Sequence, residues 1–105
     1  MAHRALIHRA QDDVAVAVAD LEPGERLEIP CQDGSQTQRV TAVQAIPLGH
    51  KLALRDLPEG HEVLEYGQAV GVTTAPIRQG EHVHVHNLRS KRWGKSVAGQ
   101  ASQAS

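Results

Sequence analysis

The sequence has 105 residues, of which 40% are hydrophobic, and a formal net charge of −1 at pH 7 with neutral histidines. This length allows one compact domain, and the near-neutral charge indicates neither a nucleic-acid nor a membrane-surface partner. Cys31 is the single cysteine, which excludes an internal disulfide and favours a reducing cytoplasm, and the polar N-terminal residues and lack of a long apolar run predict no signal peptide or membrane span.

The first two predicted elements are short and apolar. Residues 4–9 (RALIHR) predict a strand. In residues 12–21 (DDVAVAVADL), valine at every second position predicts a strand. The same segment also fits a short helix, because aspartate is a common helix cap and alanine a good helix former. Periodicity alone leaves both interpretations open.

A hairpin-like arrangement follows. The EPGE segment at 22–25 predicts a turn, and residues 26–29 (RLEI) predict a short strand. Asp-Gly at the centre of 32–36 (QDGSQ) is typical of a hairpin turn. Residues 38–46 (QRVTAVQAI) alternate well and predict the clearest strand of this half.

The second half is punctuated by glycine and proline. A Pro-Gly turn opens the apolar segment 47–54, and 55–63 is a turn-rich link. Within 62–77, glycines 67 and 71 predict a sharp bend rather than one long strand. Residues 78–88 (RQGEHVHVHNL) predict a turn and then a strand.

The whole pattern predicts a mostly-β domain over residues 1–90, with at most short helices. No internal repeat is recognisable. Residues 91–105 contain a brief basic run and then small polar residues without periodicity, which predicts a disordered tail.

The segment GEHVHVHN carries three of the seven histidines, at 82, 84 and 86. On a strand they would share one face while Val83 and Val85 enter the core. Neighbouring histidines would lie about 6.6–6.8 Å apart and the outer pair about 13 Å apart, so a flat strand does not bring all three to one ion. A pair joined by His50 or by a residue of another chain could bind a metal. A solvated polar face is the plain alternative.

Two smaller motifs suggest ligand contacts. In PLGHK, residues 47–51, the backbone at Gly49 allows close approach and Lys51 supplies positive charge, which suits an anionic ligand. An ordinary surface turn is the alternative. Tyr66, before Gly67, could pack its ring across the bend and offer its hydroxyl to a partner. Core packing is the alternative, and it is the role that we expect.

Several motifs together resemble the SAF module of the altronate/galactarate dehydratase family. They are LIHRAQDDVAVAVADLEPGE (6–25), IPLGHKLALRDL (46–57), VLEYGQAVGVTTAPIRQGEHVHVHNL (63–88) and KRW (91–93). The resemblance implies an SAF-type β-clip fold over residues 1–90.

The resemblance also implies a function. The chain would be the small subunit of a two-component lyase, inactive alone, that dehydrates altronate or galactarate to a 2-keto-3-deoxy acid with a large catalytic subunit. It implies a divalent metal, iron(II), bound mainly by or with that subunit. Two alternatives are the small subunit of a sulfolactate sulfo-lyase and a non-catalytic SAF module that binds sugar acids. Self-association is left open.

The chemistry of such a lyase suggests residue roles. An elimination needs a base, an acid or Lewis acid, and positive charge beside the carboxylate. We therefore expect Lys51, Gly49 and Tyr66 to bind the substrate. The expected acid–base groups are His84, His86 and His50. His84 and His86, and less strongly His82, are the expected metal ligands.

Overall fold

The computed structural model describes residues 3–90, and within this range the chain forms strands and no helix. The prediction for residues 91–105 lies outside the described residues. No helix among those described has the length and hydropathy needed to cross a membrane. The strands are β1 (Ala5–Leu6), β2 (Val14–Ala17), β3 (Arg26–Pro30), β4 (Thr37–Thr41), β5 (Lys51–Ala53), β6 (Glu62–Glu65), β7 (Gln68–Thr73), β8 (His82–Val83) and β9 (Leu88–Ser90).

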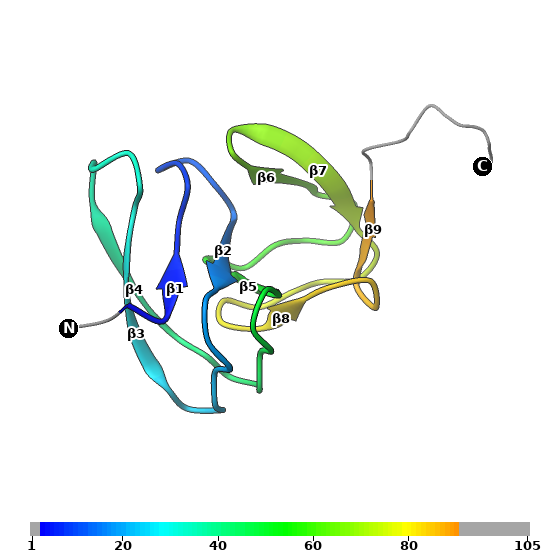
Figure 1. The fold of residues 1–105 in the computed structure, drawn as a ribbon. Coiled ribbons are helices and arrows are strands. Elements are labelled where there is room, and N and C mark those ends of the chain that lie inside the picture. Colours follow the sequence, from blue (N-terminus) through cyan, green and yellow to red (C-terminus); the bar gives the residue numbers. More distant parts are fainter. Residues whose placement is uncertain (1–2, 91–105) are drawn as a thin grey trace.

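A central four-stranded sheet lies between a two-stranded and a three-stranded sheet (Figure 1). Its antiparallel strands follow the order β1-β2-β5-β8. The β3–β4 hairpin stands on one side, and the three-stranded sheet β6-β7-β9 stands on the other. The mostly-β prediction is confirmed, as is the hairpin around residues 32–36.

Each face of the central sheet contributes to a different hydrophobic core. Ala15 of β2 and Leu52 of β5 enter the core shared with β3 and β4. Val14 and Ala53, their neighbours along the same strands, enter the core shared with β6, β7 and β8. Successive strand residues point to opposite faces, so both faces must be apolar here. This explains the Val-Ala pattern of β2, and the helix interpretation of 12–21 is wrong.

The two aspartates before β2 serve the β6–β7 hairpin instead of a helix. Both are buried. The Asp12 carboxylate accepts hydrogen bonds from the backbone N–H groups of Tyr66 (2.9 Å) and Gly67 (3.0 Å). Asp13 accepts one from the backbone of Leu64 at 2.9 Å. Acceptors placed here satisfy amides at a tight turn that would otherwise be buried without partners.

The structure reveals an internal repeat that sequence inspection misses. A buried aliphatic residue, two variable residues and a glycine with φ between 81° and 87° occur four times. In the first half Leu21 pairs with Ile46 as an antiparallel bridge, and in the second half Leu57 pairs with Ile77. Each of these glycines occupies a backbone region that glycine adopts at little cost. The copies are residues 21–24, 46–49, 57–60 and 77–80.

Two strand predictions need correction. The strand expected at 38–46 ends at Thr41, because Val43 leaves the hairpin and donates its N–H to the carbonyl of Gly80. The bend predicted in 62–77 occurs at Tyr66–Gly67, but Gly71 lies inside β7. A Cβ at Gly71 would lie 2.7 Å from the carbonyl oxygen of Arg89. Gly71 therefore permits the close approach of β9 rather than a bend.

Candidate functional site

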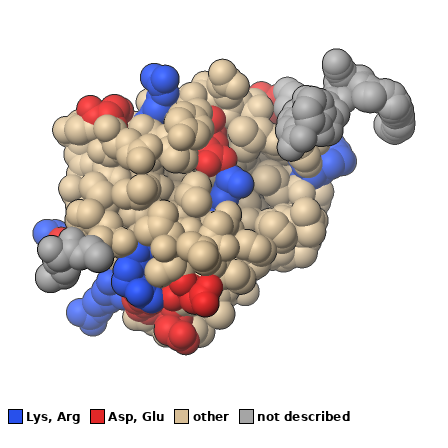
Figure 2. Space-filling model, in the orientation of Figure 1, with Lys and Arg blue, Asp and Glu red and all other residues tan. Residues whose placement is uncertain are grey.

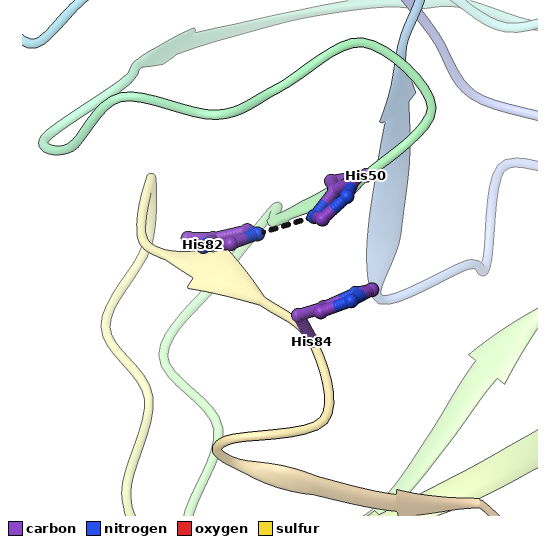
Figure 3. A group of neighbouring side chains, drawn as sticks. All are labelled: His50, His82 and His84. Carbon is purple, nitrogen blue, oxygen red and sulfur yellow. Dashed lines mark hydrogen bonds between the residues drawn. The ribbon is translucent and has the colours of Figure 1, made fainter.

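Three histidines meet at the edge of the central sheet (Figure 3). His50 comes from the turn before β5, His82 begins β8, and His84 follows β8. One ring nitrogen of each lies within 4.8 Å of the corresponding nitrogens of the other two. His50 Nδ1 and His82 Nε2 share a hydrogen bond of 2.8 Å. The rings of His50 and His84 stack with centroids 3.9 Å apart.

The side chain of Asn87 sets the path that carries His84 to this position. Asn87 is almost fully buried, and its amide donates to the carbonyl of His82 (2.8 Å) while its oxygen accepts the N–H of His84 (3.0 Å). These bonds replace ladder bonds and turn the chain after β8. The strand expected through residue 86 therefore ends at Val83, and the prediction that Val85 enters the core is wrong, because Val85 is 81% exposed.

His86 lies beside this trio without joining it. Its ring is 5.1 Å from that of His82, centroid to centroid. The nitrogens that approach one another within 4.8 Å belong to His50, His82 and His84. The structure thus brings together His50, an expected acid–base residue, with His82 and His84, while the roles given to all four histidines stay predictions.

Burial and mutual proximity favour the neutral imidazoles. Burial lowers the pKa of His82 from its ordinary value, and the neighbouring imidazoles, that of His86 first, lower it further. Desolvation also lowers the pKa of His84, although this residue is exposed, and the nearby His50 and His86 lower it further. A neutral imidazole has a free lone pair that can accept a proton or bind a metal ion.

The backbones of His50 and His82 are held by bonds to other segments. The N–H of His50 donates to Pro47 across the turn, and its carbonyl accepts the N–H of Ala17 in β2 at 2.8 Å. The N–H of His82 donates to the side chain of Gln44 at 2.9 Å. Two parts of the chain, 32 residues apart, are therefore fixed next to each other before any ligand arrives.

A second polar group borders the histidines. Lys51 is half-buried, and its Nζ lies 3.7 Å from a carboxylate oxygen of Glu65. The other oxygen of Glu65 lies 3.4 Å from His8 Nε2, and the ring of His8 stacks on Tyr66 with centroids 3.7 Å apart. The core packing expected of Tyr66 is wrong, because this side chain is 55% exposed.

A hollow connects the two groups. It has a volume of about 350 Å³ and is lined by Lys51, Glu65, Val70, Val83, His84, Val85, Leu88 and Ser90. Lys51 and His84 thus face the same space. Gly49, expected to offer its backbone to a ligand, has φ of 86° and already donates its N–H to the carbonyl of Ala17. Its observed contribution is to the turn that carries His50.

Sequence reasoning does not find His8, Glu65 or Asn87. His8 and Glu65 lie within the family-like segments, but their spacing gives no signal of a site. Contacts between strands that are distant in the sequence, including the pairings of β1 with β2 and of β2 with β5, bring them near Lys51. Asn87 carries a weak signal, since asparagine after a strand is typical of a turn.

The face drawn in Figure 2 has no extended patch of one charge: where acidic and basic side chains occur on it, they lie largely beside one another.

Comparison with known proteins places this β domain in a family. The family model for the altronate/galactarate dehydratase SAF domain matches residues 3–91. The chain belongs to that family of SAF domains, and the resemblance found in the sequence is confirmed.

Among individual relatives, the subunit alpha of (2R)-sulfolactate sulfo-lyase from Chromohalobacter salexigens is 45% identical over 89 residues, covering 84% of this chain and 95% of that subunit. The corresponding subunit alpha from Paracoccus pantotrophus is 44% identical over 55 residues, or 52% of this chain and 82% of that subunit. The altronate dehydratase of Escherichia coli is 42% identical over 81 residues, which are 77% of this chain but 15% of that enzyme. The relatives are lyases or lyase subunits, which supports a lyase-type role.

Proposed function

We propose that this chain is the small subunit of a two-component sulfo-lyase that acts on a sulfonated 2-hydroxy acid of the sulfolactate type. The observation that carries the proposal is the 45% identity to a sulfo-lyase subunit alpha, 95% of which is covered. We therefore prefer the sulfo-lyase function, which was an alternative in the sequence analysis, to sugar-acid dehydration. In this proposal the chain is inactive alone, works in the cytoplasm, and shares its site with a large subunit.

The reaction is an elimination. A base removes the proton from the carbon that bears the hydroxyl group, the neighbouring carbon–sulfur bond breaks, and sulfite leaves with the bonding electrons. The resulting enol tautomerises to a 2-keto acid, so atoms and electrons balance without an oxidant. General acid–base groups typically contribute about 10²–10⁴-fold to such proton transfers.

The described residues supply groups suited to these steps. Lys51 carries the positive charge that a carboxylate or sulfonate needs, and it lines the same hollow as His84. The hydrogen-bonded pair of His50 and His82 can accept or donate a proton. We assign the divalent metal implied by the family resemblance, iron(II), mainly to the large subunit or to its interface with this chain.

Dehydration of a sugar acid is the second candidate function. It is favoured by the 42% identity to an altronate dehydratase and by the description of the matching family. The same groups would act, with water as the leaving group instead of sulfite. A third outcome, binding of a sugar acid without turnover, would leave the chain as a recognition module.

The test is reconstitution. The chain would be produced with the large subunit found beside it in its source cells, and (2R)-sulfolactate, altronate and galactarate would be supplied separately while sulfite and 2-keto acid are measured. We expect the complex to release sulfite from sulfolactate and no 2-keto acid from altronate or galactarate. We also expect kcat to fall by about 100-fold or more in His84→Gln. His3→Gln, an exposed histidine outside the site, is the matched control and should retain the wild-type kcat.

Formation of a 2-keto acid from altronate or galactarate without sulfite would replace the proposal with the second candidate. Tight binding of a sugar acid by this chain alone, without turnover in the complex, would support the recognition module. Full activity of His84→Gln would remove the histidine cluster from the chemistry.

A further inference from the structure

The donor atoms of the histidine cluster suit a metal ion rather than only a proton. The three nitrogens lie within 4.8 Å of one another. In a tetrahedral site with metal–nitrogen bonds of about 2.0–2.1 Å, ligand nitrogens lie roughly 3.3–3.4 Å apart. The 2.8 Å pair would open slightly, and the third nitrogen would move inward by about 1.5 Å at most, which side-chain rotation can provide.

The cluster is also ordered before binding. Asn87 fixes the backbone at His82 and His84, and the turn before β5 fixes His50. Ligands positioned by buried partners lose less freedom when they bind. A surface group of histidines placed by chance would lack such supports.

We propose that His50, His82 and His84 bind one divalent transition-metal ion of the first row, leaving a fourth coordination position open. Three neutral imidazoles without a carboxylate or thiolate favour zinc, cobalt, nickel or iron(II) over calcium or magnesium, which prefer oxygen ligands. The His84 side of the cluster borders the hollow that contains Lys51. An anionic oxygen is therefore the ligand class that suits the open position, since it would bind the positive ion and lie near Lys51, whose Nζ is 3.7 Å from the Glu65 carboxylate in the same hollow.

This inference is independent of the proposed lyase activity, because the ion binds to this chain without substrate or large subunit. The probe is zinc added to the full chain, with affinity measured by calorimetry and geometry by the visible spectrum of the cobalt(II) form. We expect one ion per chain, and a loss of affinity of about 100-fold or more in each of His50→Gln, His82→Gln and His84→Gln. This is at least the loss that supporting residues around metal ligands produce.

Two variants separate this site from simpler explanations. His3→Gln is the matched control and should bind zinc as the wild type does. His86→Gln tests the ligand pair expected from sequence alone. A loss in His86→Gln equal to that in His84→Gln, with His50→Gln unaffected, would overturn the three-ligand site.

A measurement on the wild-type chain tests the site without relying on variants that could unfold. In the NMR spectrum of the imidazole nitrogens, zinc should shift the signals of His50, His82 and His84 while those of His3 and His61 stay in place. Absence of these shifts at a millimolar zinc concentration, or a wild-type affinity no higher than that of His50→Gln, would overturn the proposal. Failure here would leave sulfite release in the reconstituted complex untouched.

Discussion

Asp12 is fully buried, and its carboxylate joins two segments far apart in the sequence. One oxygen accepts the N–H of Gly67, while the other accepts those of Arg9 (3.1 Å) and Tyr66 (2.9 Å). Tyr66 has φ of 59°, which is uncommon for a residue other than glycine. The carboxylate thus supports a turn that side-chain sterics oppose.

We predict that Asp12→Asn lowers the free energy of unfolding by about 2–4 kcal/mol. Asparagine retains one oxygen and places an NH₂ group against backbone donors, and each buried donor without a partner costs about 1–3 kcal/mol. Urea unfolding followed by circular dichroism measures the change. Asp56→Asn is the control, because Asp56 is exposed and accepts one backbone bond, so the expected loss is below about 1 kcal/mol. Equal losses in the two variants would contradict this account of Asp12.

At the scale of the elements, the four glycine turns look alike but differ in what surrounds them. Gly24 has φ of 84° and Gly80 has φ of 87°, so alanine is strained in both. A Cβ at Gly24 would meet nothing within 4 Å, whereas one at Gly80 would lie 2.0 Å from the carbonyl oxygen of Thr41. The turn before β8 therefore packs directly against the end of β4.

We predict that Gly24→Ala costs about 1–2 kcal/mol from backbone strain alone. Gly80→Ala should cost at least about 2 kcal/mol more, because β4 and the turn must separate. Thermal unfolding of both variants gives the comparison. If Gly80→Ala folds poorly, reduced yield of soluble protein beside a well-folded Gly24→Ala supports the prediction, and similar melting temperatures would contradict the packing argument.

The sequence predicts hairpins better than it predicts where strands end. Asp-Gly at residues 33–34 marks a local turn, and local signals of this kind are contained in a few neighbouring residues. The end of β8 depends on Asn87, and the end of β4 depends on the N–H of Val43 bonding to Gly80. Such long-range or side-chain hydrogen bonds produce no periodic pattern of residues in the sequence. The internal repeat is also hard to find in the sequence, because its copies share only an aliphatic residue and a glycine.

The candidate site, like the strands, could be predicted from the sequence only in part. The sequence indicates His50 as a partner for the histidine segment, and the structure brings the two together at 2.8 Å. The sequence also predicts a flat strand that carries His82, His84 and His86 on one face. In the structure this strand ends at Val83, and a turn follows. The sequence therefore supplies the residue types, while the bend that gathers three of them arises from tertiary contacts.

At the scale of the whole molecule, large exposed apolar side chains flank the histidine cluster. Leu48, which is 61% exposed, lies in the same turn as His50, and Val85, which is 81% exposed, directly follows His84. Large exposed apolar side chains are a common feature of surfaces that bind another protein. We therefore expect the large subunit to cover this edge and to enclose the cluster.

Leu48→Asp tests this arrangement. We predict that it weakens association with the large subunit by about 10-fold or more, because a charged side chain would be buried at the contact, while zinc affinity and the melting temperature of the isolated chain stay near the wild-type values. Gln36→Asp, an exposed change at the β3–β4 turn, is the control and should associate normally. Association would be measured by surface plasmon resonance, with one purified subunit immobilised and the other in solution. Unchanged association of Leu48→Asp would place the large subunit on another face of this chain. The histidine cluster would then have to act while exposed to solvent. A substrate anion is held less strongly there than in an enclosed site.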